Sequence, residues 1–203
     1  MTSADHRSAP AWSHVEEFLR THEADRIPHP GGTLLEHLAR VAALLADWGT
    51  DSAVQAAGLC HAAYGTDGFD GALLGLDERD ALAELVGERA EALVYLYASC
   101  GRAAVYPRLG RDGEPLFHDR FTGRDHTPPE EDLRAFLAIT AANELDVLTH
   151  NAELAARYGP GLYRLLSRTR DLLPPAAWLA WQARPELRPE VRPEPGQVSA
   201  KGI

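Results

Sequence analysis

Apolar residues recur at helical spacing along most of the chain. Between residues 33 and 49 they fall at positions 34, 35, 38, 41, 42, 45 and 48, a period that predicts an amphipathic helix. The pattern also predicts helices over 12–22, 53–64, 78–86, 87–100 and 128–158, and shorter ones over 160–170 and 174–182. No strand-like alternation of useful length occurs. We therefore expect an all-α fold, a single helical bundle of six to nine helices within residues 11–182.

Polar residues at the boundaries support these helices. Thr33 followed by Glu36 forms a capping box, Asp51 or Ser52 is a good N-cap, and Pro128–Pro129 precedes an acidic first turn. Residues 101–129 are expected to be a long connection without regular structure, a length that often marks function. Residues 1–10 are expected to be flexible. Residues 183–203, which repeat Arg-Pro-Glu, are expected to be disordered.

Composition narrows the classes of function. The 203-residue chain is 45% hydrophobic, which suits one core, and its net charge of −10 argues against nucleic acid as a partner. No apolar run is long enough to span a membrane, and the N-terminus lacks the apolar segment of a signal peptide. We expect a cytoplasmic protein. The oligomeric state is left undecided: an exposed apolar face on the predicted helix 87–100 would favour a homodimer.

Three of the nine histidines are candidate ligands. His37 lies in the capped helix, His61 in the apolar helix that follows, and His29 in the loop before both. If the two helices are antiparallel neighbours, His37 and His61 lie at similar height. Facing neutral imidazoles joined by oxygen ligands form a metal site, although a histidine in a helix is more often a packed core residue.

Two further residues are candidates for contacting a substrate. Tyr64 follows His61 by three positions on the same helical face, so its hydroxyl could reach a substrate held there; packing of the ring is the simpler alternative. Arginines are frequent in 101–129 on an otherwise acidic chain, and an arginine can clamp a phosphate or carboxylate. Arg120, within Asp-Arg-Phe-Thr-Gly (119–123), is our choice, whereas Arg102, Arg108 and Arg111 are expected to be solvated.

Over residues 29–150 the sequence resembles the HD-domain superfamily. The resemblance rests on LLEHLARVAALLADW (34–48), AAGLCHAAYGT (56–66) and ITAANELDVL (139–148). It implies an all-helical metalloprotein, of phosphohydrolase or oxygenase type, with His37 and His61 as metal ligands. An uncharacterised HD-like subgroup shares His-x-x-Tyr-Gly-Thr and Asp-Arg-Phe-Thr-Gly.

The sequence departs from the HD pattern at two ligand positions. Ala62 stands where the superfamily has the aspartate of its His-Asp pair, and Asn143 where it has a late aspartate. A dinuclear site is therefore not expected. Asn143 supplies only a neutral carbonyl oxygen; Asp146, on the same helix face, or Glu144, which points elsewhere, could supply a carboxylate if turned inward.

Three functions follow from this pattern. The first is a mononuclear metalloenzyme that acts on a small anionic substrate and holds iron or zinc at His29, His37 and His61 with oxygen from Asn143 or Asp146. Its candidate catalytic residues are Tyr64, Arg120 and Glu144. The second is a metal-free enzyme with histidine as acid–base. The third is a ligand-binding or structural protein that kept the fold without the metal.

Overall fold

The computed structural model describes residues 12–69, 71–111 and 115–189, and within them the chain is all-α, as predicted. The α-helices are α1 (Ser13–Thr21), α2 (Leu34–Asp47), α3 (Ser52–Cys60), α4 (Arg79–Val86), α5 (Glu88–Ser99), α6 (Arg102–Val105), α7 (Glu130–His150), α8 (Ala152–Arg168) and α9 (Pro175–Gln182). Three single turns of 3₁₀-helix accompany them: η1 (Leu76–Glu78), η2 (Arg170–Leu172) and η3 (Pro185–Leu187). None of the described helices has the length and apolar character required to cross a membrane.

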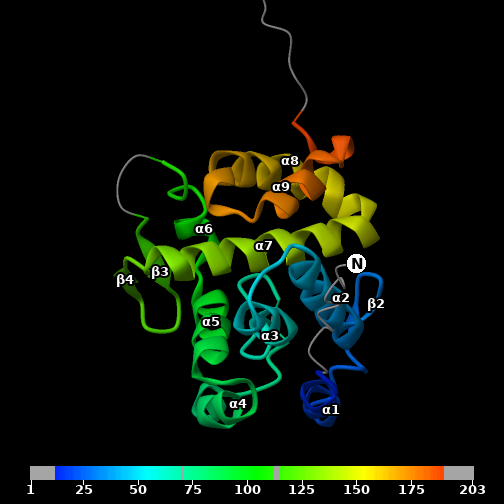
Figure 1. Ribbon diagram of the computed structural model, residues 1–203, viewed down its shortest axis with the longest axis vertical. Coiled ribbons are helices and arrows are strands. Elements are labelled where there is room, and N and C mark those ends of the chain that lie inside the picture. The colour runs from blue at the N-terminus through cyan, green and yellow to red at the C-terminus, as the bar shows by residue number, and fades with distance from the viewer. Residues whose placement is uncertain (1–11, 70, 112–114, 190–203) are drawn as a thin grey trace, which may run out of the picture.

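The longest helix, α7, runs through the middle of the molecule. Helices α2, α3 and α5 pack on one side of it, and α8 and α9 on the other (Figure 1). Fourteen residues of α7 are buried, including polar ones near its C-terminal half. A polar side chain there is therefore enclosed by neighbouring elements instead of facing water.

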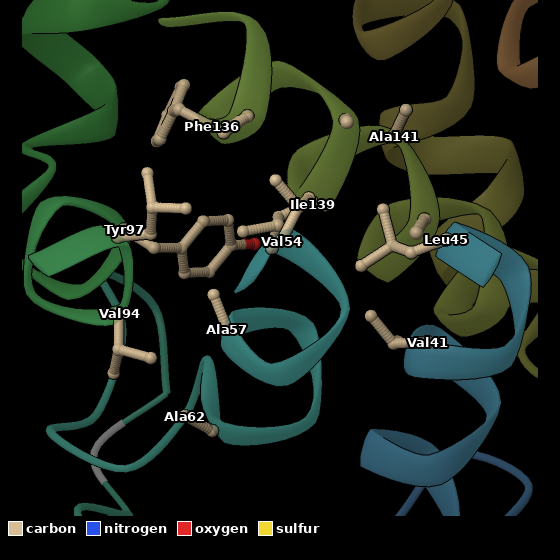
Figure 2. Close-up of a cluster of buried hydrophobic side chains, with 14 of the residues drawn as sticks. Val41, Leu45, Val54, Ala57, Ala62, Val94, Tyr97, Phe136, Ile139 and Ala141 are labelled. Atoms are coloured by element: carbon tan, nitrogen blue, oxygen red, sulfur yellow. The ribbon is translucent and has the colours of Figure 1, made fainter. Parts of the chain in front are cut away.

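The main core lies on the α2–α3–α5 side of α7. In Figure 2 the Tyr97 ring of α5 points toward Val54 of α3 and Ile139 of α7, and Leu45 of α2 lies on the other side of these two residues. Each is less than 9% exposed. Because burial of a large apolar side chain contributes roughly 1.5–3 kcal/mol, this cluster fixes the relative positions of the four helices.

The predicted helix starts are confirmed. The Thr33 hydroxyl accepts a hydrogen bond from the Glu36 backbone N–H, and the Glu36 carboxylate accepts one from the Thr33 N–H. Asp51 caps α3 by accepting a bond from the N–H of Val54. Helix α7 begins directly after Pro129 with acidic residues in its first turn. These caps satisfy N–H groups that a helix start leaves unpaired.

Gly58 lets α3 approach α2 closely. A Cβ atom at this position would lie 2.2 Å from Cδ1 of Leu45, closer than packed atoms tolerate. Glycine at a helix interior costs about 0.5–1 kcal/mol relative to alanine, so its presence in a buried helix points to this contact.

Two predicted helix boundaries are wrong. Helix α3 ends at Cys60 instead of continuing to Tyr64, so His61 is the residue just after the helix. The predicted 128–158 helix is interrupted at Asn151, whose side chain accepts the N–H of Leu154 and starts α8. Helix α8 then continues through Pro160 to Arg168. The helical period spans this junction because both helices bury their apolar faces in the same core.

The 101–129 connection contains regular structure that we did not predict. It begins with α6 and includes a hairpin of β3 (Phe117–Asp119) and β4 (Arg124–His126). The Asp119 carboxylate accepts the N–H groups of Phe121 and Thr122, and Gly123 has a φ of 68°. Asp-Arg-Phe-Thr-Gly is therefore a hairpin turn, which explains its residue types without a substrate. A smaller hairpin joins β1 (Pro28–His29) to β2 (Gly32–Thr33) just before α2.

The C-terminal tail begins later than predicted. Residues 183–189 are ordered against the bundle: η3 packs on α8 and Leu187 is fully buried beside Gly159. Burial of one leucine outweighs the extended tendency of the first Arg-Pro-Glu repeats. The rest of the predicted tail, 190–203, and the predicted flexible N-terminus lie outside the described residues.

Candidate functional site

Two histidines and an asparagine meet where α2, α3 and α7 come together. The rings of His37 and His61 have centroids 5.3 Å apart, which agrees with the prediction that the two imidazoles lie at similar height. Nε2 of His37 lies 3.0 Å from Oδ1 of Asn143, and Nε2 of His61 lies 3.1 Å from the same oxygen. These three residues, here called the histidine junction, are each less than 9% exposed.

The other ring nitrogen of each histidine is held by an acceptor. Nδ1 of His37 lies 2.7 Å from Oδ2 of Asp146, and Nδ1 of His61 lies 2.7 Å from the carbonyl oxygen of Gly58. Neither an ionised carboxylate nor a backbone carbonyl can donate, so the histidine Nδ1–H must donate in both cases. In each neutral imidazole the Nε2 atom then carries a lone pair.

When both rings are neutral, three acceptor atoms converge in the histidine junction. In that state two Nε2 lone pairs face the Asn143 carbonyl oxygen, and acceptors cannot hydrogen-bond one another. Adding a proton to His61 would relieve one contact, but burial lowers the pKa of His61 to about 3, so this ring is neutral near pH 7. A cation between the three atoms would satisfy all of them.

Asp146 contacts His37 at Nδ1, and not at Nε2, the nitrogen that faces Asn143. Its Oδ1 accepts Nε of Arg40 at 2.7 Å, and its Oδ2 accepts Nη2 of Arg40 at 3.0 Å in addition to His37. Although burial alone would raise the pKa of Asp146, hydrogen bonds from His37 and Arg40 lower it to about 2. Both oxygens therefore have partners, and these contacts orient the His37 ring. That Asp146 binds a metal stays a prediction.

His29 adjoins the histidine junction without completing it. Its ring stacks on His37 with a centroid separation of 4.0 Å, and its Nδ1 is buried with no hydrogen-bond partner in the described part of the chain. Burial and, second, the neighbouring His37 together lower the pKa of His29 to about 4. Among the described residues, no three His, Cys, Asp or Glu side chains are arranged to hold a metal ion. The predicted three-histidine ligand set is therefore not assembled in this structure, and metal binding by these residues stays a prediction.

A cavity of about 850 Å³ opens beside the histidine junction. Asn143 and His29 are in its wall, whereas His37 and His61 lie behind it. The wall comes from α7, α8, the β1–β2 hairpin, residues 66–69 and residues 102–107. Pockets of roughly 300–1,000 Å³ are typical of small-molecule sites, so the junction borders a space in which a ligand would fit.

Glu144 also lines this cavity, contrary to the prediction that it points elsewhere. Its Oε1 accepts Nδ2 of Asn143 and Nη1 of Arg102, both at 3.1 Å. Its Oε2 has no hydrogen-bond partner among the residues described. Arg102, expected to be solvated, instead lies in the cavity wall and also donates to the hydroxyl of Tyr97.

Tyr64 and Arg120, both predicted to contact substrate, are not in the cavity wall. The Tyr64 hydroxyl donates to Oε1 of Glu91 at 3.0 Å in a buried position. Nε of Arg120 donates to the carbonyl of Ala98 at 2.8 Å, and its guanidinium lies over the ring of Phe121. Both side chains have structural partners and neither lines this cavity, so their contact with a substrate stays a prediction that the cavity does not support.

Four residues near the site were missed or dismissed. Arg40 follows His37 by three positions and therefore shares its helix face, a signal that could have suggested a shared partner. Arg102 was read as part of an arginine-rich loop, and neither Tyr106 nor Arg164 carried a local pattern. All but Arg40 line the cavity; their contribution depends on the packing of α6 and α8 against α7, which no short-range pattern reveals.

Comparison with known proteins adds one family match. Residues 18–102 match the model of a domain of unknown function, DUF6817. This segment contains His29, His37, His61 and Arg102 but ends before Asn143. No curated protein and no solved structure matches the chain. The resemblance to the HD-domain superfamily is not tested by these comparisons and stays a prediction.

Proposed function

We propose that this protein is a small-molecule enzyme with one divalent metal ion at the histidine junction and an anionic substrate in the adjoining cavity. One observation carries the proposal: with both rings neutral, the Nε2 acceptors of His37 and His61 lie 3.0 and 3.1 Å from a third acceptor, Oδ1 of Asn143. A buried polar group without a partner costs roughly 1–3 kcal/mol, and a cation would remove that cost for all three.

The donor set fits zinc or ferrous iron. Imidazole nitrogens suit both ions, and both histidines have their Nδ1 atoms held by a second partner, as metal-binding histidines commonly do. Because no set of three His, Cys, Asp or Glu ligands is arranged for a metal among the described residues, the Asn143 amide oxygen would be a necessary ligand. A neutral oxygen leaves the ion with more positive charge than a carboxylate would.

Such an ion would act as a Lewis acid toward a phosphoryl or carbonyl oxygen and would lower the pKa of bound water. The chain's own groups would position the reactants. Asp146 and the Gly58 carbonyl hold the two imidazoles in their tautomers. Oε2 of Glu144 is a free acceptor for a proton, and the Arg102 guanidinium beside it would orient an anionic group. This arrangement supports the predicted catalytic role of Glu144.

Metal analysis tests the proposal. Protein purified without chelator should contain about one equivalent of metal, which elemental mass spectrometry would identify. Zinc would favour the hydrolytic branch of the HD resemblance and iron the oxygenase branch. His61→Ala should lose the metal, whereas His14→Ala, at an exposed position on α1, should retain it. Circular dichroism would confirm that both variants fold.

A metal-free ligand-binding protein is the second candidate, and one feature of Asn143 favours it. Turning the amide by half a rotation would direct the two hydrogens of Nδ2 at the two imidazole Nε2 atoms. The amide oxygen would then face Oε1 of Glu144, a contact that requires a proton on Glu144. The histidines would be structural, and the cavity would bind its ligand without a metal.

Asn143→Asp distinguishes the two candidates. With a metal at the junction, the added negative charge should tighten metal binding by tenfold or more, measured by competition with a chromophoric chelator. Without a metal, the same substitution places a carboxylate against two imidazole lone pairs, and the free energy of unfolding should fall. A destabilised variant that binds no metal would overturn the metalloenzyme proposal.

A further inference from the structure

The cavity is elongated along α8. The residues of α8 that line it extend from Leu154 to Arg168 and include Tyr158, Leu162 and Leu165 on the same helical face. A helix rises about 1.5 Å per residue, so Leu154 and Arg164 are separated by about 15 Å along the axis. A compact ion such as phosphate would leave most of this length empty.

The two ends of the cavity differ in chemistry. At the N-terminal end of α8, most of the wall is apolar: Leu148, Leu154, Pro28 and Pro30 line it together with the ring of His29. These residues lie together because the turn of the β1–β2 hairpin at Gly31 packs against His150, next to the junction of α7 and α8. This end offers an apolar surface without a charged side chain.

The C-terminal end of α8 carries cations that no carboxylate neutralises. Arg164 is exposed and has no hydrogen-bond or ion-pair partner in the described segments. Arg168 donates to two neutral acceptors, the backbone carbonyls of Tyr106 and Leu109. The two carboxylates of the cavity wall, Asp67 and Glu144, are bonded to Arg102 instead, so Arg164 and Arg168 are available to an anionic ligand.

An unpaired donor lies at the same end. The Tyr106 hydroxyl is buried without a hydrogen-bond partner in the described structure, and burial raises the pKa of Tyr106 well above its usual value. The group therefore keeps its proton. Tyr106 also lines the cavity, and an unpaired buried hydroxyl calls for an acceptor that the chain does not provide.

We infer that the cavity binds an elongated organic acid with a single anionic head group and an extended apolar body. The head group lies toward Arg164 and Tyr106, and the body lies along α8 toward Leu154 and the β1–β2 hairpin. The inference deepens the proposed function by naming its substrate class, and it rests on that function only in treating the bound acid as the substrate.

Calorimetric titration of the full chain with straight-chain carboxylates tests this inference. The protein is first treated with EDTA, so that binding is measured without metal. Affinity should rise from hexanoate through octanoate to decanoate by up to about fourfold per methylene. Decanol, decylamine and inorganic phosphate should bind at least tenfold more weakly than decanoate. Biphenyl-4-carboxylate shows whether a ring system replaces the alkyl chain.

Two variants with matched controls locate the ends of the ligand. Leu154→Glu, at a half-buried apolar position, should reduce decanoate affinity more than tenfold, whereas Leu179→Glu, at a 64% exposed leucine outside the cavity, should not. Arg164→Glu should weaken binding on the order of fivefold. Arg26→Glu, at an exposed arginine outside the cavity wall, makes the same charge change as a control.

The outcomes separate this inference from the proposed function. Equal affinity for decanoate and decylamine would overturn the anionic head group, and affinity independent of chain length would overturn the apolar body. Decanoate binding that survives Leu154→Glu would place the ligand elsewhere. Metal at the histidine junction without acid binding would leave the proposed function intact and reject the inference. Acid binding by a chain that takes up no metal would support the inference and reject the proposed metalloenzyme.

Discussion

Two buried carboxylates in this protein are held in similar ways but differ in what surrounds them. Glu91 accepts Nε and Nη2 of Arg79 and the hydroxyl of Tyr64, and these three residues form the Glu91 cluster. Asp146 accepts Nε and Nη2 of Arg40 and Nδ1 of His37, and these form the Asp146 cluster. Each combines one carboxylate, one arginine and one further donor.

The difference lies in the third residue. In the Glu91 cluster, the Tyr64 hydroxyl donates its only hydrogen to the carboxylate, and the buried ring packs in the core. In the Asp146 cluster, His37 has a second nitrogen, which faces Oδ1 of Asn143 and has no hydrogen to donate when the ring is neutral. A satisfied network indicates a structural role, and an unsatisfied one indicates a site that awaits another partner.

The largest expected effect is on the Glu91 cluster. Arg79→Ala leaves a buried carboxylate without its cation, and the free energy of unfolding should fall by about 3–5 kcal/mol. Metal content and decanoate affinity should stay unchanged, because no residue of this cluster lines the cavity. Urea denaturation measures the loss. Arg134→Ala, which breaks an exposed ion pair with Glu130, is the control and should cost about 1 kcal/mol or less.

Asp146→Asn tests whether the second cluster serves the histidine junction. The neutral amide no longer fixes the His37 tautomer, so metal affinity should fall by roughly 10- to 100-fold. Competition with a chelator measures it. Asp171→Asn, at a 92% exposed side chain, should leave metal affinity unchanged. If Asp146→Asn folds and binds metal as tightly as the wild type, the two clusters do not differ in function.

The pH dependence of stability should distinguish the histidine junction, which adjoins the Asp146 cluster through His37, from the Glu91 cluster. The pKa of His61 is about 3 in the folded chain, against 6.5 for an unperturbed histidine. Below pH 6.5 the unfolded state therefore gains a proton that the folded state excludes. His61 should therefore lower the free energy of unfolding of the metal-free protein by about 1.4 kcal/mol per pH unit as the pH drops from 6.5 toward 3, and His29, whose pKa is about 4, should add a similar slope above pH 4.

Urea denaturation of EDTA-treated protein between pH 7 and 5 measures this slope. His61→Gln should reduce the slope by the contribution of one proton, about 1.4 kcal/mol per pH unit. Tyr64→Phe, in the Glu91 cluster, should lower the free energy of unfolding at every pH without changing the slope. An unchanged slope in His61→Gln would mean that the buried ring is not the group that loses its proton.

The smallest effect is expected at Arg120, which belongs to neither cluster. Arg120→Ala removes the hydrogen bond to the Ala98 carbonyl and should cost about 1 kcal/mol. Decanoate affinity should not change. A weakened affinity would restore Arg120 as a substrate contact and would show that the hairpin turn has a role beyond structure.

The sequence predicted the helical class and the facing histidines because both follow from local patterns. The capping box at Thr33 and the apolar period of 34–48 define α2 and therefore the face that carries His37. The pairing with His61 followed from the expected antiparallel arrangement of neighbouring helices. Asn143 entered only through the HD resemblance.

The remaining parts of the site depend on contacts between distant segments. Arg102 and Glu144 are 42 positions apart and meet only because α6 packs near α7. Tyr64 failed as a candidate because α3 ends at Cys60, and the turn that follows directs its hydroxyl to α5. Arg120 failed because a hairpin turn and a substrate contact favour the same residue types.

Gly58 connects the geometry of the helices to the chemistry of one ring. Its missing side chain sets the spacing of α2 and α3, and its carbonyl oxygen determines which nitrogen of His61 carries the proton. Any substitution that wedges these helices apart would therefore also loosen the imidazole. We therefore expect substitutions of Gly58 to lower stability and to disturb the orientation of the His61 ring together. Natural variation at this position should be tightly constrained, even though Gly58 does not line the cavity.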